Sequence, residues 1–487
     1  MSYILSIDAG TTGVTVLLID KQTTVVAKAY AELQQYYPQP GWVEHDPEEL
    51  LLKTKQLIEK ITPTLSPKEI AAIGITNQRE TVVVWNKNTG KPVHPAIVWQ
   101  CRRTTERCHT LKTEGYEKII KEKTGLVCDP YFSATKIEWI LNTTNENKDD
   151  LLCGTIDSWL VWNLTKEKAH VTDMSNASRT MLFNIHTKQW DEELLRLFSV
   201  DKTLLPVVKE SSEIYGHMEI DGVQIPFAGI AGDQQAALFG QCCFDEGMLK
   251  NTYGTGCFLL LNTGEKPVTS RNLLTTIAWT IRGKTSYALE GSVFIAGAAV
   301  QWLRDGLKII TSAEETAVLA HSLQDNEQVY FVPALSGLGC PYWDPDARGM
   351  IIGLTRGTTS AHLARATLES IAYQTKDIVE TMQKEAGISV VTLKADGGAA
   401  ANSFLLQFQA DILGASVVVS KNRETTALGA AFLAGLAVGF WKDQDEIQQY
   451  WKEENAFVST MSSEKREKLY SRWKDAVGRS TKWNTHS

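Results

Sequence analysis

The sequence predicts an α/β fold built from two similar halves, and three observations support this prediction. A short hairpin pattern occurs twice, at residues 4–19 and again at 248–261. Strand-like and helix-like segments alternate through both halves, as they do in α/β domains. The chain has 487 residues, which is too many for one hydrophobic core. This length allows two large domains or three smaller ones. The repeated pattern favours two, residues 1–244 and 245–487, with a ligand cleft between them.

The first half begins with strands and then contains a helix whose start is marked by clear capping residues. Asp46 is expected as the N-cap, with Pro47 at the first helical position and Glu49 at the third. The predicted buried face of this helix consists of Leu50, Thr54, Leu57 and Ile61. Apolar runs at residues 70–75 and 81–85 predict two further strands, and the alternation continues to about residue 240.

The second half repeats the pattern after its own hairpin. Strands are predicted at residues 328–332 and 390–395. Helices are predicted at residues 296–307, at 361–386 with Ser360 as the cap, directly after 397–398, and at the C-terminal end, where Leu469, Trp473 and Val477 share one face. Residues 427–441 carry no charge but are shorter than the roughly 18 residues of a membrane span. This Gly- and Ala-rich segment is interpreted as a buried helix packed closely against a neighbour.

The composition is that of an ordinary globular protein, with 43% hydrophobic and 22% charged residues. The net charge of −8 argues against a nucleic-acid-binding surface, so an anionic ligand has to be held by local groups. The start of the chain has no basic region of the kind found in secretory signals. The eight cysteines form no Cys-x-x-Cys pair and are expected to be reduced thiols of a cytoplasmic protein without a membrane span.

The two hairpin turns are candidate anion-binding sites. Residues 8–13 read Asp-Ala-Gly-Thr-Thr-Gly, and residues 253–256 read Tyr-Gly-Thr-Gly. Glycines let the backbone approach a ligand, and successive N–H groups in such turns form an anion nest. Either hairpin alone could be an ordinary turn, but the pair suggests one polyphosphate held between two domains. The usual phosphate loop is absent, because Gly283-Lys284-Thr285 lacks the earlier glycine, where Ala278 stands.

The first hairpin and five further segments resemble a known family. Residues 8–12 after a strand resemble the first phosphate motif of the actin-like ATPase superfamily. The other segments are 76–81 (Thr-Asn-Gln-Arg-Glu-Thr), 97–103 (Ile-Val-Trp-Gln-Cys-Arg-Arg), 131–139 (Tyr-Phe-Ser-Ala-Thr-Lys-Ile-Glu-Trp), 231–235 (Ala-Gly-Asp-Gln-Gln) and 396–402 (Asp-Gly-Gly-Ala-Ala-Ala-Asn). In this order they resemble the FGGY family of carbohydrate kinases, and within it the members that phosphorylate glycerol. The resemblance implies two duplicated actin-like, ribonuclease H-like domains that use ATP and Mg²⁺.

Phosphoryl transfer needs a base for the attacking hydroxyl and a metal ion on the phosphates. Asp233 follows an apolar run at 225–231 and is the candidate general base, which the resemblance favours. An alternative interpretation makes it the N-cap of the next helix. Asp8, at the mouth of the first turn, is the candidate Mg²⁺ partner through water. Its alternative role is turn chemistry.

A small polyol needs a pocket with a charged fork, a carboxylate and aromatic walls. By resemblance, glycerol is bound by Arg79, Glu80, Tyr131, Asp233 and Gln234, with Trp99 and Phe258 as apolar walls. Without the resemblance, adjacent opposite charges such as Arg79 and Glu80 are usually a solvated surface pair, and a single Trp or Phe is usually core.

The resemblance also implies a nucleotide site. Thr11, Thr12 and Thr255 would contact phosphates, and Gly297, Gln301, Gly398 and Asn402 would hold the ribose and adenine. The two glycines at 397–398 suit close backbone approach. A plain turn between strand and helix is the alternative there.

The first hairpin departs from the family pattern. Relatives that phosphorylate glycerol usually have Gln after the first Asp, and Ser-Ser-Arg after the paired threonines. This chain has Ala9, and then Gly13-Val14-Thr15. The family arginine would be a charge-assisted donor to the phosphates, and Thr15 cannot supply that charge. Either another cation replaces it, or nucleotide affinity or turnover is reduced.

The leading hypothesis is ATP-dependent phosphorylation of glycerol to sn-glycerol 3-phosphate. One alternative is a kinase for another polyol or a ketose of the same family. A second alternative is a nucleotide-binding regulator without kinase activity, for which the altered hairpin is the only support. The resemblance implies a homodimer or a homotetramer, although the sequence identifies no interface. The loop at 213–224 shows no basic cluster, so control by a sugar phosphate is not expected there.

Overall fold

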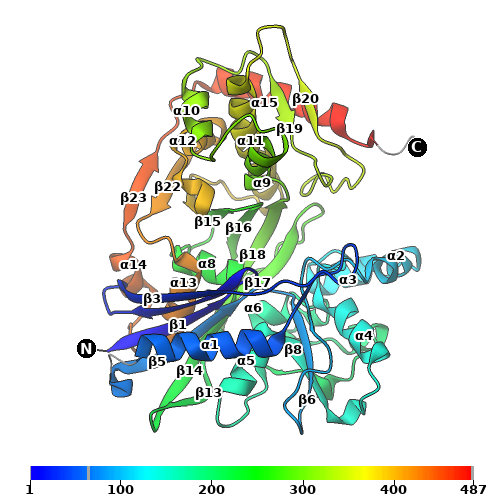
Figure 1. The fold of residues 1–487 in the computed structure, drawn as a ribbon, viewed down its shortest axis with the longest axis vertical. Helices are drawn as coiled ribbons and strands as arrows, with labels where there is room; N and C mark the ends of the chain where they lie inside the picture. The colour runs from blue at the N-terminus through cyan, green and yellow to red at the C-terminus, as the bar shows by residue number, and fades with distance from the viewer. Residues whose placement is uncertain (1, 63–65, 484–487) are drawn as a thin grey trace.

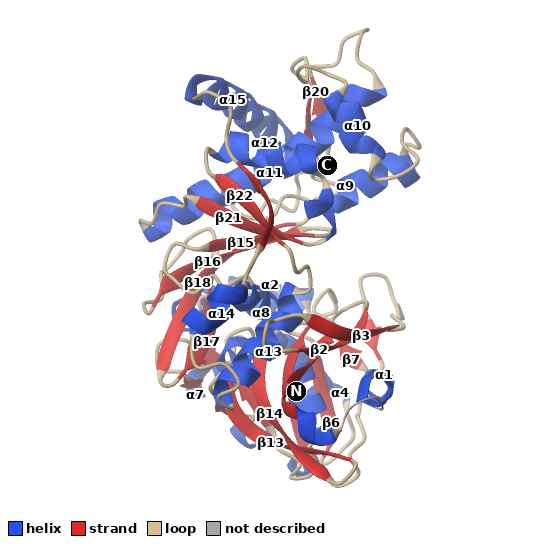
Figure 2. Cartoon of the chain, turned by 90° about the vertical axis from the view of Figure 1, so that its left-hand side faces the viewer, coloured by secondary structure: helices blue, strands red, loops and turns tan. Residues whose placement is uncertain are grey.

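The computed structural model describes residues 2–62 and 66–483. Its two large β-sheets, one from each half of the sequence, are flanked by helices, which confirms the predicted α/β class. Figure 1 shows the N-terminal half below and the C-terminal half above, with the sheets facing the middle of the molecule. Figure 2 shows the same two bodies from the side, joined by helices that lie between the sheets.

The N-terminal sheet has six strands in the order β13-β14-β5-β1-β2-β3. Its strands are β1 (Tyr3–Ala9), β2 (Gly13–Ile19), β3 (Val25–Glu32), β5 (Ile70–Asn77), β13 (Ser212–Ile220) and β14 (Val223–Gly232). Strands β1 and β2 form the predicted antiparallel hairpin, while β1, β5 and β14 run parallel. The carboxyl ends of these three parallel strands therefore meet at one edge, the usual location of ligand sites in such sheets.

The C-terminal sheet has seven strands in the order β17-β18-β16-β15-β21-β22-β23. They are β15 (Leu249–Tyr253), β16 (Cys257–Gly264), β17 (Leu274–Ile281), β18 (Lys284–Val293), β21 (Thr392–Asp396), β22 (Ser416–Ser420) and β23 (Glu453–Phe457). Strands β15 and β16 are the second predicted hairpin, and β15 runs parallel to β21. The second hairpin thus occupies the same place in its sheet as the first.

The remaining strands form smaller sheets. A four-stranded sheet in the N-terminal half has the order β4-β7-β6-β8. Its strands are β4 (Glu44–His45), β6 (Val82–Asn86), β7 (Ala96–Ile97) and β8 (Leu151–Thr155). Two-stranded pairs are formed by β9 (Val171–Asp173) with β12 (Val207–Lys209), β10 (Phe183–Asn184) with β11 (Gln189–Trp190), and β19 (Tyr330–Val332) with β20 (Met350–Ile352).

The helices of the N-terminal half are α1 (Pro47–Ile61), α2 (Thr105–Thr113), α3 (Glu117–Thr124), α4 (Ser133–Thr143), α5 (Ile156–Leu164), α6 (Met174–Ala177), α7 (Glu192–Leu197) and α8 (Asp233–Gly240). Those of the C-terminal half are α9 (Gly297–Gln301), α10 (Glu315–His321), α11 (Ser360–Ala386), α12 (Ser403–Leu413), α13 (Thr425–Ala437), α14 (Gln444–Tyr450) and α15 (Ser463–Ser480). No helix in the described ranges combines the length and the apolar character that crossing a membrane requires.

Alternation along the strands divides the core into layers. Leu5 and Ile7 of β1 belong to a cluster with α1 and α5, whereas Ile4 belongs to another cluster with α8 and α13. Leu249 and Tyr253 of β15 face α11 and α12 in a third cluster. Helices α8 and α13 therefore lie between the two sheets and connect the halves.

The close crossing of α8 and α13 depends on glycine. A Cβ on Gly240 would lie 1.9 Å from the carbonyl oxygen of Thr425, and one on Gly429 would lie 1.8 Å from that of Ala236. No larger residue fits at either position without separating the helices. This confirms the predicted close packing of the segment around 427–441.

Several element boundaries differ from prediction for local reasons. Asp46 accepts a hydrogen bond from Glu48 N and caps α1 as predicted. Helix α11 is capped by Thr359, whereas Ser360, the predicted cap, is its first residue. The predicted helix at 296–307 is α9 followed by one π-helical turn, Trp302–Gly306, which sequence periodicity does not distinguish from α-helix.

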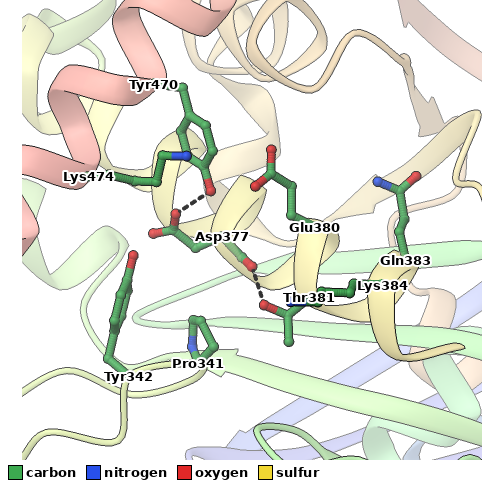
Figure 3. Close-up of a pocket in the computed structure, with 9 residues that line it drawn as sticks. All are labelled: Pro341, Tyr342, Asp377, Glu380, Thr381, Gln383, Lys384, Tyr470 and Lys474. Atoms are coloured by element: carbon green, nitrogen blue, oxygen red, sulfur yellow. Dashed lines mark hydrogen bonds between the residues drawn. The ribbon is translucent and has the colours of Figure 1, made fainter.

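The closing helix α15 is fastened to α11 by a buried carboxylate. Asp377 accepts hydrogen bonds from Tyr470 Oη at 2.6 Å and Trp473 Nε1 at 2.8 Å. A cavity of about 400 Å³ lies beside this contact, and Tyr342, Glu380 and Lys474 are among its lining residues (Figure 3). Because both carboxylate oxygens of Asp377 already have donors, we interpret the cluster as structural.

Candidate functional site

The two hairpins have tight turns that leave polar groups at the ends of their strands. In the first, Gly10 N donates to Gly13 O at 3.0 Å, and in the second, Gly254 N donates to Gly256 O at 2.8 Å. Thr12 and Thr255 are exposed at these turns. The N–H groups of Gly10 and Gly254 are used within the turns. The exposed hydroxyls of Thr12 and Thr255 are therefore the donors that these turns offer to an anion.

Arg79 and Glu80 are buried, in contrast to the usual surface pair. They follow β5, and their residues are 3% and 1% exposed. Glu80 has a φ of +60°, so the chain turns sharply at this point. An uncommon backbone conformation at Glu80, next to a second buried charge, indicates a functional site and not packing alone.

Arg79 connects residues from both halves of the chain. Its Nε lies 3.2 Å from Asp233 Oδ1, and its Nη2 donates to Tyr131 Oη at 3.3 Å. Glu290 of β18 accepts from Nη1 at 2.5 Å and from Nη2 at 3.0 Å. This two-pronged contact fixes the plane of the guanidinium group.

Glu80 is held by a second buried arginine. Arg179 Nε donates to Glu80 Oε1 at 2.6 Å, and Arg179 Nη2 donates to Glu290 Oε1 at 3.0 Å. Burial alone would raise the pKa of Glu290, but Arg179 and Arg79 lower it to about 2. The four side chains thus form one charge network with Glu290 at its centre.

Sequence reasoning missed Arg179 and Glu290. Glu290 is a lone acidic residue in an apolar strand, and Arg179 lies in a segment of small and apolar residues. The available signal was a single charged residue in a segment predicted to be buried. Such a residue needs a charged partner, so it could have been identified as part of a buried network.

Asp233 lies at the carboxyl end of β14, at the first position of α8. The N-cap is Gly232, so the alternative interpretation of Asp233 as the N-cap is wrong. Its side chain is 27% exposed, and Oδ1 accepts from Gln234 N at 2.7 Å. Burial raises the pKa of Asp233, while Arg79 and Lys250 oppose the shift. The carboxylate is oriented by Arg79 and remains accessible to a ligand.

The first hairpin is tied to the aromatic residues of the predicted polyol site. Trp99 Nε1 donates to Thr11 Oγ1 at 2.9 Å. The ring of Trp99 meets that of Tyr131 edge-on, with centroids 5.5 Å apart. Since Tyr131 also contacts Arg79, the structure connects Thr11, Trp99, Tyr131, Arg79 and Asp233 in one chain of contacts.

Asp8 lies within electrostatic range of Asp233. Burial raises the pKa of Asp8 to about 7, the carboxylates of Asp233 and Glu424 add to the shift, and Lys28 opposes it. The residues that the structure describes give the Asp8 carboxylate no hydrogen bond or ion pair, and they contain no cluster of three metal-ligating side chains. An under-compensated carboxylate of this kind suits a cation that is mainly held by water and phosphate oxygens.

The predicted nucleotide residues gather around the second hairpin. Ala296 N donates to Thr255 O at 2.9 Å, and Gly297 N donates to Gly254 O at 3.0 Å, so α9 begins directly on the turn. Gln301, the last residue of α9, is exposed.

Gly397 and Gly398 approach the same hairpin from the other side. Gly397 has a φ of +88°, and a Cβ on it would lie 2.5 Å from Tyr253 O. Gly398 faces open space. Asn402 is the N-cap of α12, where its side chain accepts from Leu405 N at 3.0 Å. Asn402 therefore already has a capping role, and its Nδ2 donates to Thr316 Oγ1 at 3.3 Å.

The inner face of the C-terminal sheet carries Phe258, Lys250 and Glu290. Strand pairing aligns Thr252 with Phe258, and Lys250 with Leu260, which in turn aligns with Glu290. Phe258 is half-buried on this face. Lys250 Nζ donates to Gln234 Oε1, a contact between the halves that sequence reasoning also missed.

The structure accounts for one departure of the first hairpin from the family pattern, the glycine at position 13. A Cβ on Gly13 would lie 2.5 Å from the ring of Tyr30 and 2.6 Å from the backbone oxygen of Ala31. The Tyr30 hydroxyl donates to Thr12 O at 3.3 Å. A serine at position 13 is therefore incompatible with both Tyr30 and the backbone of Ala31 in this conformation. Thr15 pairs with both Asp8 and Tyr30 across the sheet. Lys28, two residues before Tyr30 on the same face of β3, forms an ion pair with Glu424.

Comparison with known proteins agrees with this geometry. Residues 3–240 match the N-terminal domain, and residues 249–438 the C-terminal domain, of the FGGY family of carbohydrate kinases. The chain is 59% identical to glycerol kinase 2 of Thermotoga maritima, with 99% of each chain covered.

Comparison with solved structures agrees with these family matches. The crystal structure of Plasmodium falciparum glycerol kinase with ADP superimposes with a TM-score of 0.94 at 39% identity, covering 99% of this chain and 98% of that one. A xylulose kinase from Lactobacillus acidophilus shares the fold, with a TM-score of 0.90 at 23% identity and full coverage of both chains. With both domain matches, a relative of high identity over its full length and the predicted two-hairpin architecture in place, this chain belongs to the FGGY family of carbohydrate kinases.

Proposed function

We propose that this chain is a glycerol kinase, which transfers the terminal phosphoryl group of ATP to glycerol and releases sn-glycerol 3-phosphate and ADP. The observation that carries the proposal is the position of Asp233. Its carboxylate is held by Arg79 at 3.2 Å, beside buried charges from both halves of the chain. Its full-length relative of 59% identity carries the same name.

In the proposed mechanism Asp233 accepts the proton of the attacking hydroxyl. A general base has to lie within hydrogen-bond reach of that hydroxyl, and the exposed edge of Asp233 allows this approach. Arg79 and Glu80 bind the other hydroxyls of glycerol, because one offers donors and the other acceptors. Trp99, Tyr131 and Phe258 cover its C–H edge, and Gln234 adds an amide.

The nucleotide is proposed to lie against the second hairpin, with its phosphates between the two turns. Thr11, Thr12 and Thr255 donate to phosphate oxygens, and Gly297, Gln301, Gly398 and Asn402 line the ribose and adenine. Gly297 and Gly398 support this assignment, because the first abuts the turn at Gly254 and the second faces open space.

Mg²⁺ is proposed to bind near Asp8, through water and the phosphates. The fit rests on the carboxylate itself, whose pKa is raised to about 7 by burial and by neighbouring negative charge. A bound Mg²⁺ neutralises phosphate charge and helps to orient the terminal group. Asp8 has no competing protein cation in direct contact within the described ranges.

Lys28 is proposed as the cation that compensates for the absent arginine at position 15. It acts on Asp8 electrostatically and projects from the face that also carries Thr15. We further propose the division into domains 1–244 and 245–487, a cytoplasmic location and assembly as a homodimer or homotetramer. The eight buried, unpaired cysteines support a reducing compartment.

The test is an ADP-release assay of the purified chain with a panel of acceptors. Glycerol is expected to give the highest kcat/KM, and Asp233→Asn is expected to lower kcat by about 10²- to 10⁴-fold while ADP still binds. A ketopentose such as xylulose as the best acceptor would instead identify a sugar kinase. Tight ATP binding without any acceptor-stimulated ADP release would indicate a regulator.

A further inference from the structure

Lys250 is a buried lysine on the inner face of the C-terminal sheet. The alternation of β15 directs Leu249 and Tyr253 into the core beneath α11 and α12. Lys250 and Thr252 point to the opposite face, towards α8. The Lys250 residue is 0% exposed, so its ammonium group is shielded from bulk water.

The ammonium group of Lys250 has only neutral acceptors. It donates to Gln234 Oε1 and, at 2.9 Å, to Thr252 Oγ1. No carboxylate of the described residues forms an ion pair with it within 4.0 Å. A buried cation without a counter-charge is energetically costly. Burial lowers the pKa of Lys250 to about 8, although Asp396, Asp233 and Glu290 favour its charged form from a distance.

A neighbouring lysine shows what a purely structural role looks like in this sheet. Lys394 of β21 pairs in register with Lys250 on the same face. Its Nζ donates to Gln241 O at 2.6 Å and to Cys242 O at 3.4 Å, beyond the C-terminal end of α8. It also lies 4.2 Å from the ring of Trp451. The charge of Lys394 thus stabilises the C-terminal end of a helix, where cations are favoured. The charge of Lys250 does not lie at a helix terminus of this kind.

Lys250 contacts one residue beside the proposed base and one beside the proposed phosphate turn. Gln234 directly follows Asp233, the proposed base. Thr252 lies two residues before Gly254, where the proposed phosphate turn begins. We propose that Lys250 is a further catalytic residue, whose ammonium group binds an oxygen of the phosphoryl group during its transfer. This inference rests on the proposed function.

The chemical step is balanced without any further reactant. The bond between the terminal phosphorus and the bridging oxygen of ADP breaks, and a bond from the glycerol oxygen to that phosphorus forms. The hydroxyl proton passes to Asp233, and Lys250 keeps its protons. Charge on the equatorial oxygens is then stabilised by a donor that is already in place, so that no reorganisation is needed during the reaction.

The experiment compares Lys250→Met and Lys250→Gln with Lys394→Met as the matched control. Each Lys250 variant is expected to lower kcat by about 10²- to 10³-fold, with the KM for ATP changed much less. Binding of ADP with aluminium fluoride and glycerol, a transition-state mimic, is expected to weaken in parallel. Lys394→Met is expected to lower thermal stability and leave kcat within a few-fold of the parent. A kcat within fivefold of the parent in both Lys250 variants would overturn the inference.

Two further measurements separate catalysis from positioning of Gln234. If Lys250 only orients Gln234, then Gln234→Leu and Lys250→Met have the same effect and the double variant adds nothing. The proposal requires the Lys250 variants to be more severe and to lose the transition-state mimic.

The unmodified chain supplies a test that does not depend on variant folding. The charged groups around Lys250 are Asp233 on α8, Glu290 on β18, Asp396 on β21 and Arg79 after β5. The kcat/KM for ATP is expected to fall as pH rises through about 8, where Lys250 loses its charge. A flat profile to pH 10 contradicts the inference. If the unmodified chain releases no ADP with any acceptor, the proposed function itself has failed.

Discussion

Glu290 of the C-terminal sheet accepts hydrogen bonds from Arg79 of the N-terminal half with both carboxylate oxygens. Arg79 Nη1 donates to Oε2 at 2.5 Å, and Nη2 donates to Oε1 at 3.0 Å. The two residues are 211 positions apart. Through this contact the C-terminal half, which is proposed to bind ATP, orients Arg79, which is proposed to bind glycerol. Packing of the two halves against each other and assembly of the polyol site are therefore physically linked.

Replacing Glu290 with Gln is expected to damage both stability and glycerol binding. Removing one partner of a buried ion pair costs about 3–5 kcal/mol, because Arg79 and Arg179 remain buried without their counter-charge. The KM for glycerol is expected to rise by at least tenfold. Chemical denaturation and steady-state kinetics measure the two effects. The control is Glu192→Gln, which removes an exposed ion pair with Lys202 at 3.2 Å, and unfolding free energies equal for both variants would contradict the expected role.

Replacing Trp99 with Phe keeps an apolar wall but removes the indole N–H that Thr11 accepts. Loss of this hydrogen bond is expected to cost about 1 kcal/mol, or roughly a fivefold rise in the KM for glycerol and ATP together. The double variant with Thr11→Val measures the coupling between the two residues. Strictly additive effects would show that the hairpin and the aromatic wall act independently.

Replacing Lys28 with Met tests whether it substitutes for the absent arginine. The KM for ATP is expected to rise by about three- to tenfold at low ionic strength, and the effect is expected to shrink with salt because the side chain is partly exposed. Lys202→Met, a surface lysine in a similar ion pair, is the control. An unchanged KM for ATP would leave the first hairpin without a compensating cation.

The buried carboxylate of Asp377 is expected to give stability a specific pH dependence. Burial raises its pKa from 3.8 to about 6 in the folded chain. Its contribution is therefore fully present below pH 3.8, where both states are protonated, and is lost as pH rises through about 6. A shift of this size corresponds to about 3 kcal/mol.

The measurement compares the free energy of unfolding of the parent and of Asp377→Asn from pH 3 to pH 7. The variant is expected to gain on the parent by about 3 kcal/mol across this range. A difference that stays constant with pH would mean that Asp377 titrates normally.

The sequence predicted the parts of the site that depend only on residues close together in the chain. Hairpins are formed by neighbouring residues, so the turns after β1 and β15 could be recognised from Gly and Thr spacing. Asp46 capped α1 as expected, because capping depends on residues within one turn. Thr359 replaced Ser360 as the cap of α11 because two adjacent hydroxyl residues compete for that role.

The network around Arg79 could not be predicted in the same way. Its partner Glu290 is brought in only when both sheets are complete, and Arg179 depends on the same distant carboxylate. The burial of Glu80 likewise follows from tertiary packing and not from its charged neighbour. The glycine at position 13 became intelligible only once Tyr30 was seen to occupy the space of a side chain.

In the proposed complex, one triphosphate lies between the two hairpins and points at a glycerol hydroxyl on Asp233. The most direct measurement is a crystal structure with glycerol and an unreactive ATP analogue. We expect the terminal hydroxyl within about 2.6–3.2 Å of the Asp233 carboxylate, with phosphate oxygens contacted from the turns at residues 10–13 and 254–256. A nucleotide that touches only one hairpin, or a glycerol molecule away from Asp233, would contradict the account.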